Sequence, residues 1–185
     1  MKILLLVMAL VTPIEQLDST LQVTVQQHRM QILERAMRTA SDIGKPVTVC
    51  GTLLAIAVLD AAQGVPLARV AIVSAAVVNL VVEGLKRLTN RTRPDGERHR
   101  SNSSFPSSHA ANAFALAYVF SRRWPRASLM FLAGATLVAL SRVYLNRHFA
   151  SDVVVGALLG VVLAWVVARQ MRWPTRTAGP PISHN

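Results

Sequence analysis

Long runs of uncharged apolar residues recur along this chain and restrict its fold more than any other feature. Five runs are clear, at 46–59, 70–82, 109–121, 127–141 and 153–168, and a weaker one lies at 3–11. Each is shorter than the about 20 residues that a perpendicular helix needs to cross hydrocarbon, so flanking residues must extend it. Arginines near the run ends have side chains long enough to reach the membrane surface. We therefore expect an all-α integral-membrane helical bundle with about six transmembrane helices.

The alternative is a soluble bundle that buries helices of ordinary length. Five such runs in 185 residues leave too little polar surface to cover them. The chain is 52% hydrophobic and 16% charged, with a formal net charge of +11, and this apolar content argues against a disordered basic tail or a nucleic-acid binder. The single cysteine, Cys50, forms no internal disulfide, and no Cys/His cluster indicates zinc.

The two ends of the chain carry weaker signals. Lys2 and the run at 3–11 resemble a secretory signal in length, but no small-residue cleavage site precedes Pro13, which favours a short uncleaved helix or signal anchor. Between 18 and 40, apolar residues recur at helical spacing among charged ones, which indicates an amphipathic surface helix or a solvated helix on the bundle. We expect one domain over 1–169 and a flexible tail over 170–185.

Small and polar residues inside the runs indicate helix packing. Gly156 and Gly160 form a GxxxG step, which lets two helices approach closely, and we expect it to act within the bundle. Asn79 and Asn112 lie in different runs, where amide side chains typically form hydrogen bonds between helices.

Cationic residues are expected to gather at one end of the bundle. With alternating spans, the third ends near Lys86 and the fifth near Arg142, and both ends reach the same face of the membrane. With Arg93 they form a group that repels itself unless an anion is bound, and the planar fork of arginine matches phosphate oxygens. Ser107 and Ser108 precede the fourth span, where free N–H groups favour an anion. The predicted ligand is a phosphoryl group.

Two histidines are expected at the same end. His148 and Asp152 are four residues apart, so the carboxylate can orient the imidazole and leave one ring nitrogen free to attack. His109 has an ordinary pKa of about 6.5, which suits a proton donor near neutral pH. The sequence therefore contains a candidate nucleophile, its orienting group and an acid.

Three motifs of this region resemble those of the type 2 phosphatidic acid phosphatase (PAP2) superfamily. The first is Lys86, six residues, then Arg93 and Pro94; the second is the stretch 106–109, Pro-Ser-Ser-His. The third is Ser141 and Arg142, five residues, a histidine, three residues and an aspartate, which are the His148 and Asp152 already named. Together the motifs span 86–152, and the helical layout extends the resemblance over most of the remaining chain.

The resemblance implies a metal-independent and cofactor-independent membrane phosphatase acting on a lipid phosphate or diphosphate. His148 would form a phosphohistidine, Asp152 would orient it, and His109 would protonate the leaving oxygen. The phosphoryl oxygens would be held by five residues, Lys86, Arg93, Ser107, Ser108 and Arg142. Ser108 stands where the family usually has glycine, and serine prefers negative φ, so the anion pocket is expected to be intact only if the backbone there is helical.

Other interpretations stay open at this stage. The basic loop around Lys86 and Arg93 would also attract anionic headgroups. His148 and Asp152 would also fit an interfacial histidine with a helix cap, and His109 would fit a capping residue. As whole-protein alternatives, a lipid phosphotransferase would use the same phosphohistidine, and a non-catalytic lipid-binding protein would need none.

Charge placement bears on orientation. The tight loop 122–126 holds three arginines, which places it in the cytoplasm by the positive-inside rule and the site at the periplasmic or exterior face of a bacterial inner membrane. A phosphate pocket at the hydrocarbon boundary suits a lipid headgroup. The sequence does not choose among phosphatidic acid, phosphatidylglycerol phosphate, isoprenoid diphosphates and lipid A.

Overall fold

The structure, a computed structural model, describes residues 2–59, 64–97 and 103–172. Over these residues the chain is helical and contains no strand, so the predicted all-α fold is confirmed. The helices are α1 (Lys2–Gln27), α2 (Gln31–Ile43), α3 (Pro46–Leu59), α4 (Gly64–Thr89), α5 (Ser108–Arg123), the 3₁₀ helix η2 (Pro125–Ala127), α6 (Ser128–Tyr144) and α7 (Ala150–Gln170). From residue 173 onward, the predicted tail lies outside the described residues.

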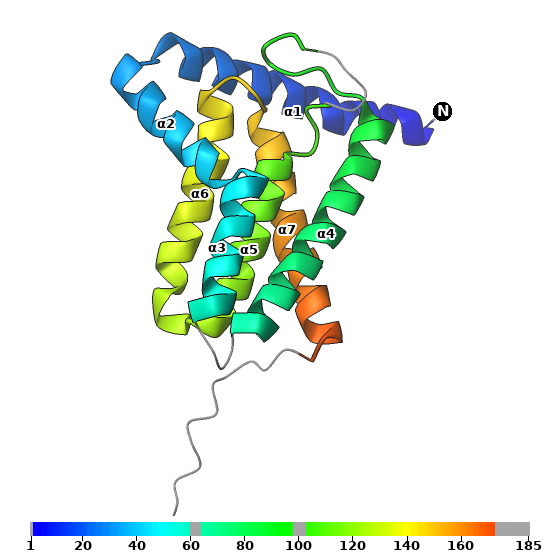
Figure 1. Ribbon diagram of the computed structural model, residues 1–185. Helices are drawn as coiled ribbons and strands as arrows, with labels where there is room; N and C mark the ends of the chain where they lie inside the picture. Colours follow the sequence, from blue (N-terminus) through cyan, green and yellow to red (C-terminus); the bar gives the residue numbers. More distant parts are fainter. Residues whose placement is uncertain (1, 60–63, 98–102, 173–185) are drawn as a thin grey trace, which may run out of the picture.

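Helices α3 to α7 stand side by side, and α1 lies across one end of them (Figure 1). The run at 3–11, predicted to be the first span, is part of α1, which continues through Pro13 to Gln27. It therefore crosses the end of the bundle instead of joining the upright helices. The count of about six spans is therefore not confirmed. The run at 3–11 contains no polar residue, but polar residues later in α1 bond the ends of the helices beneath it.

The predicted amphipathic helix at 18–40 is interrupted. Helix α1 ends at Gln27 and α2 begins at Gln31, with Met30 extended between them at φ −119° and ψ 137°. Both backbone polar groups of Met30 bond the Tyr144 hydroxyl, which accepts from its N–H at 2.8 Å and donates to its carbonyl at 3.1 Å. The Met30 carbonyl also accepts from the Glu34 N–H at 3.0 Å, the bond that opens α2. For the Met30 N–H, a tyrosine more than 100 residues away thus supplies the acceptor that a continuing α1 would have supplied.

The bundle has the dimensions and surface of a membrane protein. Within the described residues, three helical segments are long and apolar enough to cross a bilayer, namely α4, the η2–α6 segment from Pro125 to Tyr144, and α7. Large apolar side chains are exposed around the bundle, including Leu54, Leu80 and Leu158. Because water would not favour such exposure and hydrocarbon does, these surfaces indicate an integral membrane protein.

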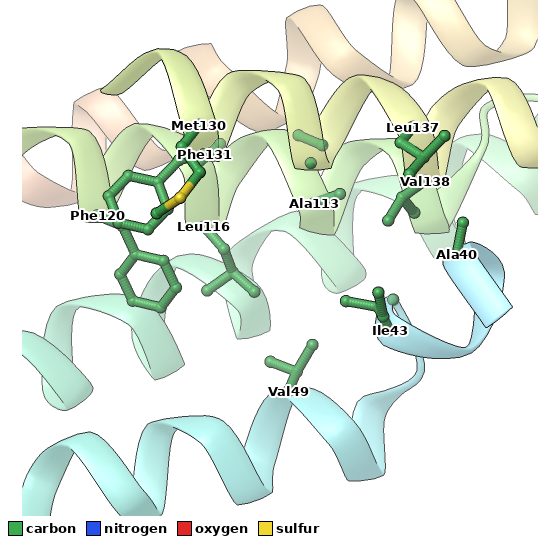
Figure 2. Close-up of a pocket in the computed structure, with 14 residues that line it drawn as sticks. Ala40, Ile43, Val49, Ala113, Leu116, Phe120, Met130, Phe131, Leu137 and Val138 are labelled. Carbon is green, nitrogen blue, oxygen red and sulfur yellow. The ribbon is translucent and has the colours of Figure 1, made fainter. Parts of the chain in front are cut away.

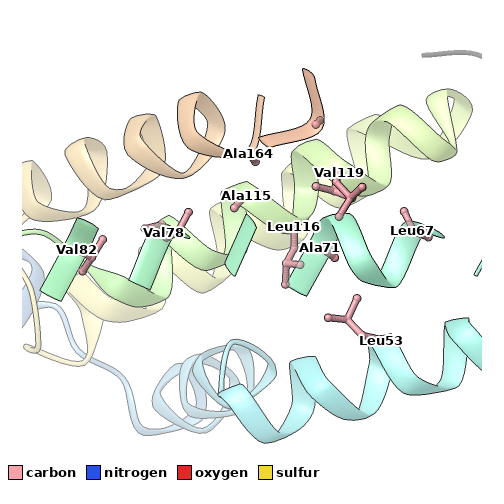
Figure 3. Packing of buried hydrophobic residues seen from close by; sticks show 12 residues of the cluster. Leu53, Leu67, Ala71, Val78, Val82, Ala115, Leu116, Val119 and Ala164 are labelled. Carbon is pink, nitrogen blue, oxygen red and sulfur yellow. The ribbon is translucent and has the colours of Figure 1, made fainter. Parts of the chain in front are cut away.

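Helices α3, α4, α5 and α7 meet in the main hydrophobic core (Figure 3). Small residues allow α5 and α7 to approach very closely. A Cβ added to Gly156 would lie 2.5 Å from the Ser107 carbonyl oxygen, and one added to Gly160 would lie 2.0 Å from the Ala111 carbonyl oxygen. The GxxxG step therefore packs within the bundle, as predicted, and it holds the start of α5 against the start of α7.

The polar residues of the spans also pair between helices. Asn79 on α4 and Asn112 on α5 exchange hydrogen bonds, with Nδ2 to Oδ1 distances of 3.2 and 3.0 Å. This confirms the predicted bond between helices and fixes the register of α4 against α5.

Candidate active site

Four helix ends meet beneath α1: the C-terminal ends of α4 and α6 and the N-terminal ends of α5 and α7 (Figure 1). The alternating directions of consecutive helices predict that these four ends lie at the same end of the bundle. The eight predicted site residues lie on these ends or in the loops next to them: Lys86, Arg93, Ser107, Ser108, His109, Arg142, His148 and Asp152.

Two asparagines turn the chain into the site. Asn90, just after α4, has φ 44°, and Asn146, just after α6, has φ 59°. Asparagine tolerates this left-handed conformation better than most residues, and it commonly ends a helix there. Each turn sends the chain inward, so that the next motif residues, Arg93 and His148, are buried at 7% and 2% exposure.

The predicted cations come together at this end. Lys86 is buried at 8% exposure and lies within electrostatic range of Arg93 and Arg142. Arg142 donates from Nη1 to Ser41 Oγ at 2.5 Å, but its buried Nε has no hydrogen-bond partner among the described residues. A buried N–H without a partner is unfavourable, and an anionic oxygen placed there would satisfy it while relieving the repulsion between the cations.

The start of α5 fits an anion as well. Ser107 is the N-cap residue and accepts a hydrogen bond from the Ala110 N–H at 3.4 Å, and the helix begins at Ser108. Ser108 is not among the residues with positive φ. Serine therefore replaces the usual glycine without backbone strain and keeps its N–H at the helix N-terminus.

His148 is held by a different acceptor from the one that the spacing suggests. Its Nδ1 lies 2.7 Å from the Ser104 carbonyl oxygen, which can only accept, so Nδ1 carries the proton and the Nε2 lone pair is free. Asp152 Oδ2 lies 3.8 Å from the same nitrogen, beyond a normal hydrogen bond. The carboxylate is near the imidazole as predicted, but the direct partner is a backbone carbonyl.

Electrostatics keep the His148 ring neutral. Burial lowers the pKa of His148 below its ordinary value of 6.5, and the Arg93 and Arg142 cations act in the same direction while Asp152 opposes them. A neutral imidazole at pH 7 is the form whose lone pair can attack an electrophile.

Asp152 is fully buried, and its oxygens are well supplied with donors. Oδ2 accepts from Ser104 Oγ at 2.5 Å and from the Phe149 N–H at 2.8 Å, and Oδ1 accepts from Arg91 Nη1 at 2.6 Å. Neither Ser104 nor Arg91 was among the site residues predicted from the sequence, and Arg91 lies in the basic loop around Lys86 and Arg93. The position of Arg91 between Lys86 and Arg93 was the available signal.

His109 opens onto a polar cavity of about 720 Å³. It lies in the first turn of α5, within electrostatic range of His148. Arg142 and Arg147 line the cavity beside it, and α2 supplies another part of the wall through Ser41 and Asp42. The contribution of α2 was not expected from the sequence, which carries no motif there.

An apolar groove of about 210 Å³ lies beside this polar cavity (Figure 2). Ala40 and Ile43 line the end of the groove near the site, and Phe120 and Phe131 line its far end. Gly44 lies where groove and cavity adjoin, since a Cβ there would meet Val138 at 2.9 Å and His109 at 3.3 Å. A hydrocarbon chain in the groove would thus end beside the cationic site.

Known proteins share both the motif region and the fold. The chain matches the PAP2 superfamily over residues 67–176. It is 35% identical over 108 residues to a lipid A 1-phosphatase of Porphyromonas gingivalis, covering 54% of this chain and 24% of that protein. It is 40% identical over 96 residues to phosphatidylglycerophosphatase B of Bacillus subtilis, covering 45% of this chain and 47% of that protein. The chain therefore matches less than half the length of either relative.

Two solved structures have the same fold. A transmembrane PAP2 type phosphatidylglycerolphosphate phosphatase from Bacillus subtilis gives a TM-score of 0.71 at 23% identity, covering 86% of this chain and 87% of that one. Aquifex aeolicus LpxE gives a TM-score of 0.72 at 22% identity, covering 81% of this chain and 93% of that one. Since the family match extends over more than half of the chain and includes all three motifs, the protein belongs to the PAP2 superfamily.

Proposed function

We propose that this protein is an integral-membrane phosphatase that hydrolyses the phosphate or diphosphate headgroup of a lipid. The observation that carries the proposal is a neutral, buried imidazole, His148, at the same helix ends as the cations Lys86, Arg93 and Arg142. The named relatives, a lipid A 1-phosphatase and a phosphatidylglycerophosphatase, act on lipids of this class.

The mechanism uses the free nitrogen of His148. Nε2 attacks phosphorus, a nitrogen–phosphorus bond forms, and the bond to the leaving oxygen breaks as His109 gives that oxygen a proton. Water then attacks the phosphohistidine and frees phosphate and His148, with His109 taking the water proton. The oxygens are held by the three cations and the start of α5, that is by Lys86, Arg93, Ser107, Ser108 and Arg142. Neither step uses a metal or a cofactor.

A lipid substrate fits the location of the site. The polar cavity takes the headgroup, and the adjacent groove between α2, α3, α5 and α6 takes part of one hydrocarbon chain. Burying each methylene group favours binding by about 0.8 kcal/mol, so the groove adds affinity that a water-soluble phosphate ester lacks.

We further propose that the site faces the periplasm or exterior of a bacterial inner membrane. The opposite end of the bundle carries several arginines, including Arg69, Arg122, Arg123, Arg126 and Arg169. Short loops rich in arginine stay in the cytoplasm. Helix α1, which begins at Lys2, lies across the site end, so Lys2 is not counted with the arginines of the opposite end. Helices α3 to α7 would cross the membrane while α1 follows its surface.

The function is tested with the purified protein and a panel of phosphorylated lipids in detergent. The panel contains phosphatidic acid, phosphatidylglycerol phosphate, an isoprenoid diphosphate and lipid A, and released phosphate is measured. We expect hydrolysis of at least one lipid, inhibition by vanadate, which mimics the phosphoryl-transfer geometry, and little effect of chelators. If every lipid stays intact under conditions that keep the protein folded, the proposal is wrong.

Filling the groove should weaken the binding of long-chain lipids selectively. Ala113 lines the groove on α5, and Ala133 on α6 is exposed outside it, so Ala113→Phe and Ala133→Phe are a matched pair. We expect Ala113→Phe to lower kcat/KM about tenfold for a long-chain lipid phosphate, equivalent to about two lost methylene contacts, while a short-chain analogue is unaffected. Equal effects of the two variants would show that the groove does not hold the substrate.

A further inference from the structure

Asp18 is a buried carboxylate that lies outside the three motifs and far from them along the sequence. It lies on α1 and is only 3% exposed, whereas its neighbours Leu17 and Ser19 are exposed. Oδ1 accepts from the Ser151 N–H at 3.0 Å, and Oδ2 accepts from Ser151 Oγ at 2.5 Å and from Arg91 Nη2 at 2.8 Å. A buried carboxylate is retained only with such donors, and Asp18 takes them from the start of α7 and the loop after α4.

Arg91 links Asp18 to the predicted catalytic aspartate. While Nη2 bonds Asp18, Nη1 donates to Asp152 Oδ1 at 2.6 Å and to Ser151 Oγ at 2.9 Å. Its guanidinium carbon lies 4.5 Å from the centre of the Phe149 ring. Although burial opposes the charge, the hydrogen bonds that Arg91 donates to Asp18 and Asp152 raise the pKa of Arg91, so the bridge is ionic. Only a planar fork with donors on two sides can join both carboxylates in this way.

Ser104 completes the connection to the imidazole. Its hydroxyl donates to Asp152 Oδ2 at 2.5 Å, and its carbonyl accepts from His148 Nδ1 at 2.7 Å. Its own N–H donates to the Arg91 carbonyl at 2.8 Å. The serine is therefore tied to Arg91, Asp152 and His148 together, and a shift of the carboxylate would move the group that sets the tautomer of the ring.

Helix α1 also holds the other side of the loop that carries His148. Gln22 Nε2 donates to the Val143 carbonyl at 3.1 Å and to Asn146 Oδ1 at 2.6 Å, and Gln26 Nε2 donates to the Tyr144 carbonyl at 3.2 Å. Asp18, Gln22 and Gln26 are spaced four residues apart, so they share one face of α1. This face bonds the end of α6 and the start of α7, the two helices between which the loop runs.

We propose that Asp18 and Arg91 are positioning residues of the reaction: they hold the Asp152 carboxylate, which through Ser104 fixes the imidazole of His148. Helix α1 is then part of the catalytic machinery and not only a surface element. The inference rests on the proposed role of His148 as nucleophile. It deepens that role by naming what orients the ring, since no described side chain bonds Nδ1 directly.

The test compares Asp18→Asn with Glu15→Gln, an exposed acid on the same helix one turn earlier. Asparagine keeps the shape of the side chain but loses the charge that holds Arg91. We expect kcat for a lipid phosphate to fall about 10- to 100-fold in Asp18→Asn, because small misplacements of a reacting group have effects of that size. KM should change less than about threefold, since Asp18 does not touch the substrate, and Glu15→Gln should match wild type. Equal kcat in the two variants overturns the inference.

A second pair separates positioning from folding. Ser104→Ala leaves α1 untouched and should lower kcat with a similarly small change in KM; wild-type kcat in this variant also overturns the inference. Arg91→Met leaves two buried carboxylates without their cation, so adding Asp18→Asn should restore part of its kcat, which two independent sites would not show.

His148→Asn is measured alongside these variants. If His148→Asn is active the proposed function fails, and if it is inactive while Asp18→Asn equals wild type, only this inference fails.

Discussion

His148→Asn is expected to lower kcat for the lipid substrate by at least about 10⁴-fold, the scale seen when an essential nucleophile is removed. Asparagine can still donate a hydrogen bond to the Ser104 carbonyl, which now accepts from Nδ1. It has no nitrogen lone pair able to attack phosphorus, because the amide nitrogen is delocalised. The variant therefore keeps the local hydrogen bond and removes only the nucleophile, and released phosphate per folded molecule measures the loss.

The matched control for this prediction is His28→Asn. His28 is exposed just after the end of α1, and its ring bonds the Thr24 carbonyl of that helix at 2.9 Å. It should retain wild-type activity. Rapid quenching of wild type with radiolabelled substrate should trap an acid-labile phosphoprotein, and His148→Asn should give none. Activity of His148→Asn within tenfold of wild type would contradict the mechanism.

Gly160→Ala is expected to lower the free energy of unfolding by at least about 2 kcal/mol, the range for overpacking a tight core contact. The added Cβ would lie 2.0 Å from the Ala111 carbonyl oxygen, so backbone must move away from backbone. For a chain of this size, such a loss lowers the thermal midpoint by about 4–8 °C. The measurement is thermal unfolding in detergent. Activity should fall as well, because the Ser107 N–H bonds the Asp152 carbonyl at 3.0 Å across the same helix pair.

Gly134→Ala is the control for this substitution. Gly134 lies in α6, where a Cβ would meet nothing within 4 Å. Alanine is the better helix former by about 1 kcal/mol, so the thermal midpoint should stay constant or rise. Equal thermal midpoints for the two variants would show that α5 and α7 can move apart at little cost in free energy. That result would contradict the close packing of these two helices.

The features that were predictable from the sequence depend on local pattern. Apolar runs mark the helices because a segment that crosses hydrocarbon must be apolar and must satisfy its own backbone hydrogen bonds. The alternating directions of these helices then bring Lys86, His109, Arg142 and Asp152 to one end of the bundle. The helical start of α5 at Ser108 was the condition under which serine could replace glycine, and the structure meets it.

Other features depend on contacts between distant residues. The Tyr144 hydroxyl bonds the Met30 backbone between α1 and α2, and the Ser104 carbonyl is the acceptor at His148 where spacing indicated Asp152. Periodicity could not indicate either contact, because a hydrogen-bond partner 44 or 114 residues away leaves no trace in the local pattern.

By itself, the sequence determined the helices, the family motifs and the end of the bundle where they meet, since hydrophobic periodicity and motif spacing are local properties of the chain. Only the tertiary structure decided the direction of α1, the acceptor of His148 and the bridge from Asp18 through Arg91 to Asp152. The physical reason is that buried polar groups must find partners once helices dock, and which partners they find depends on how the helix ends come together in space.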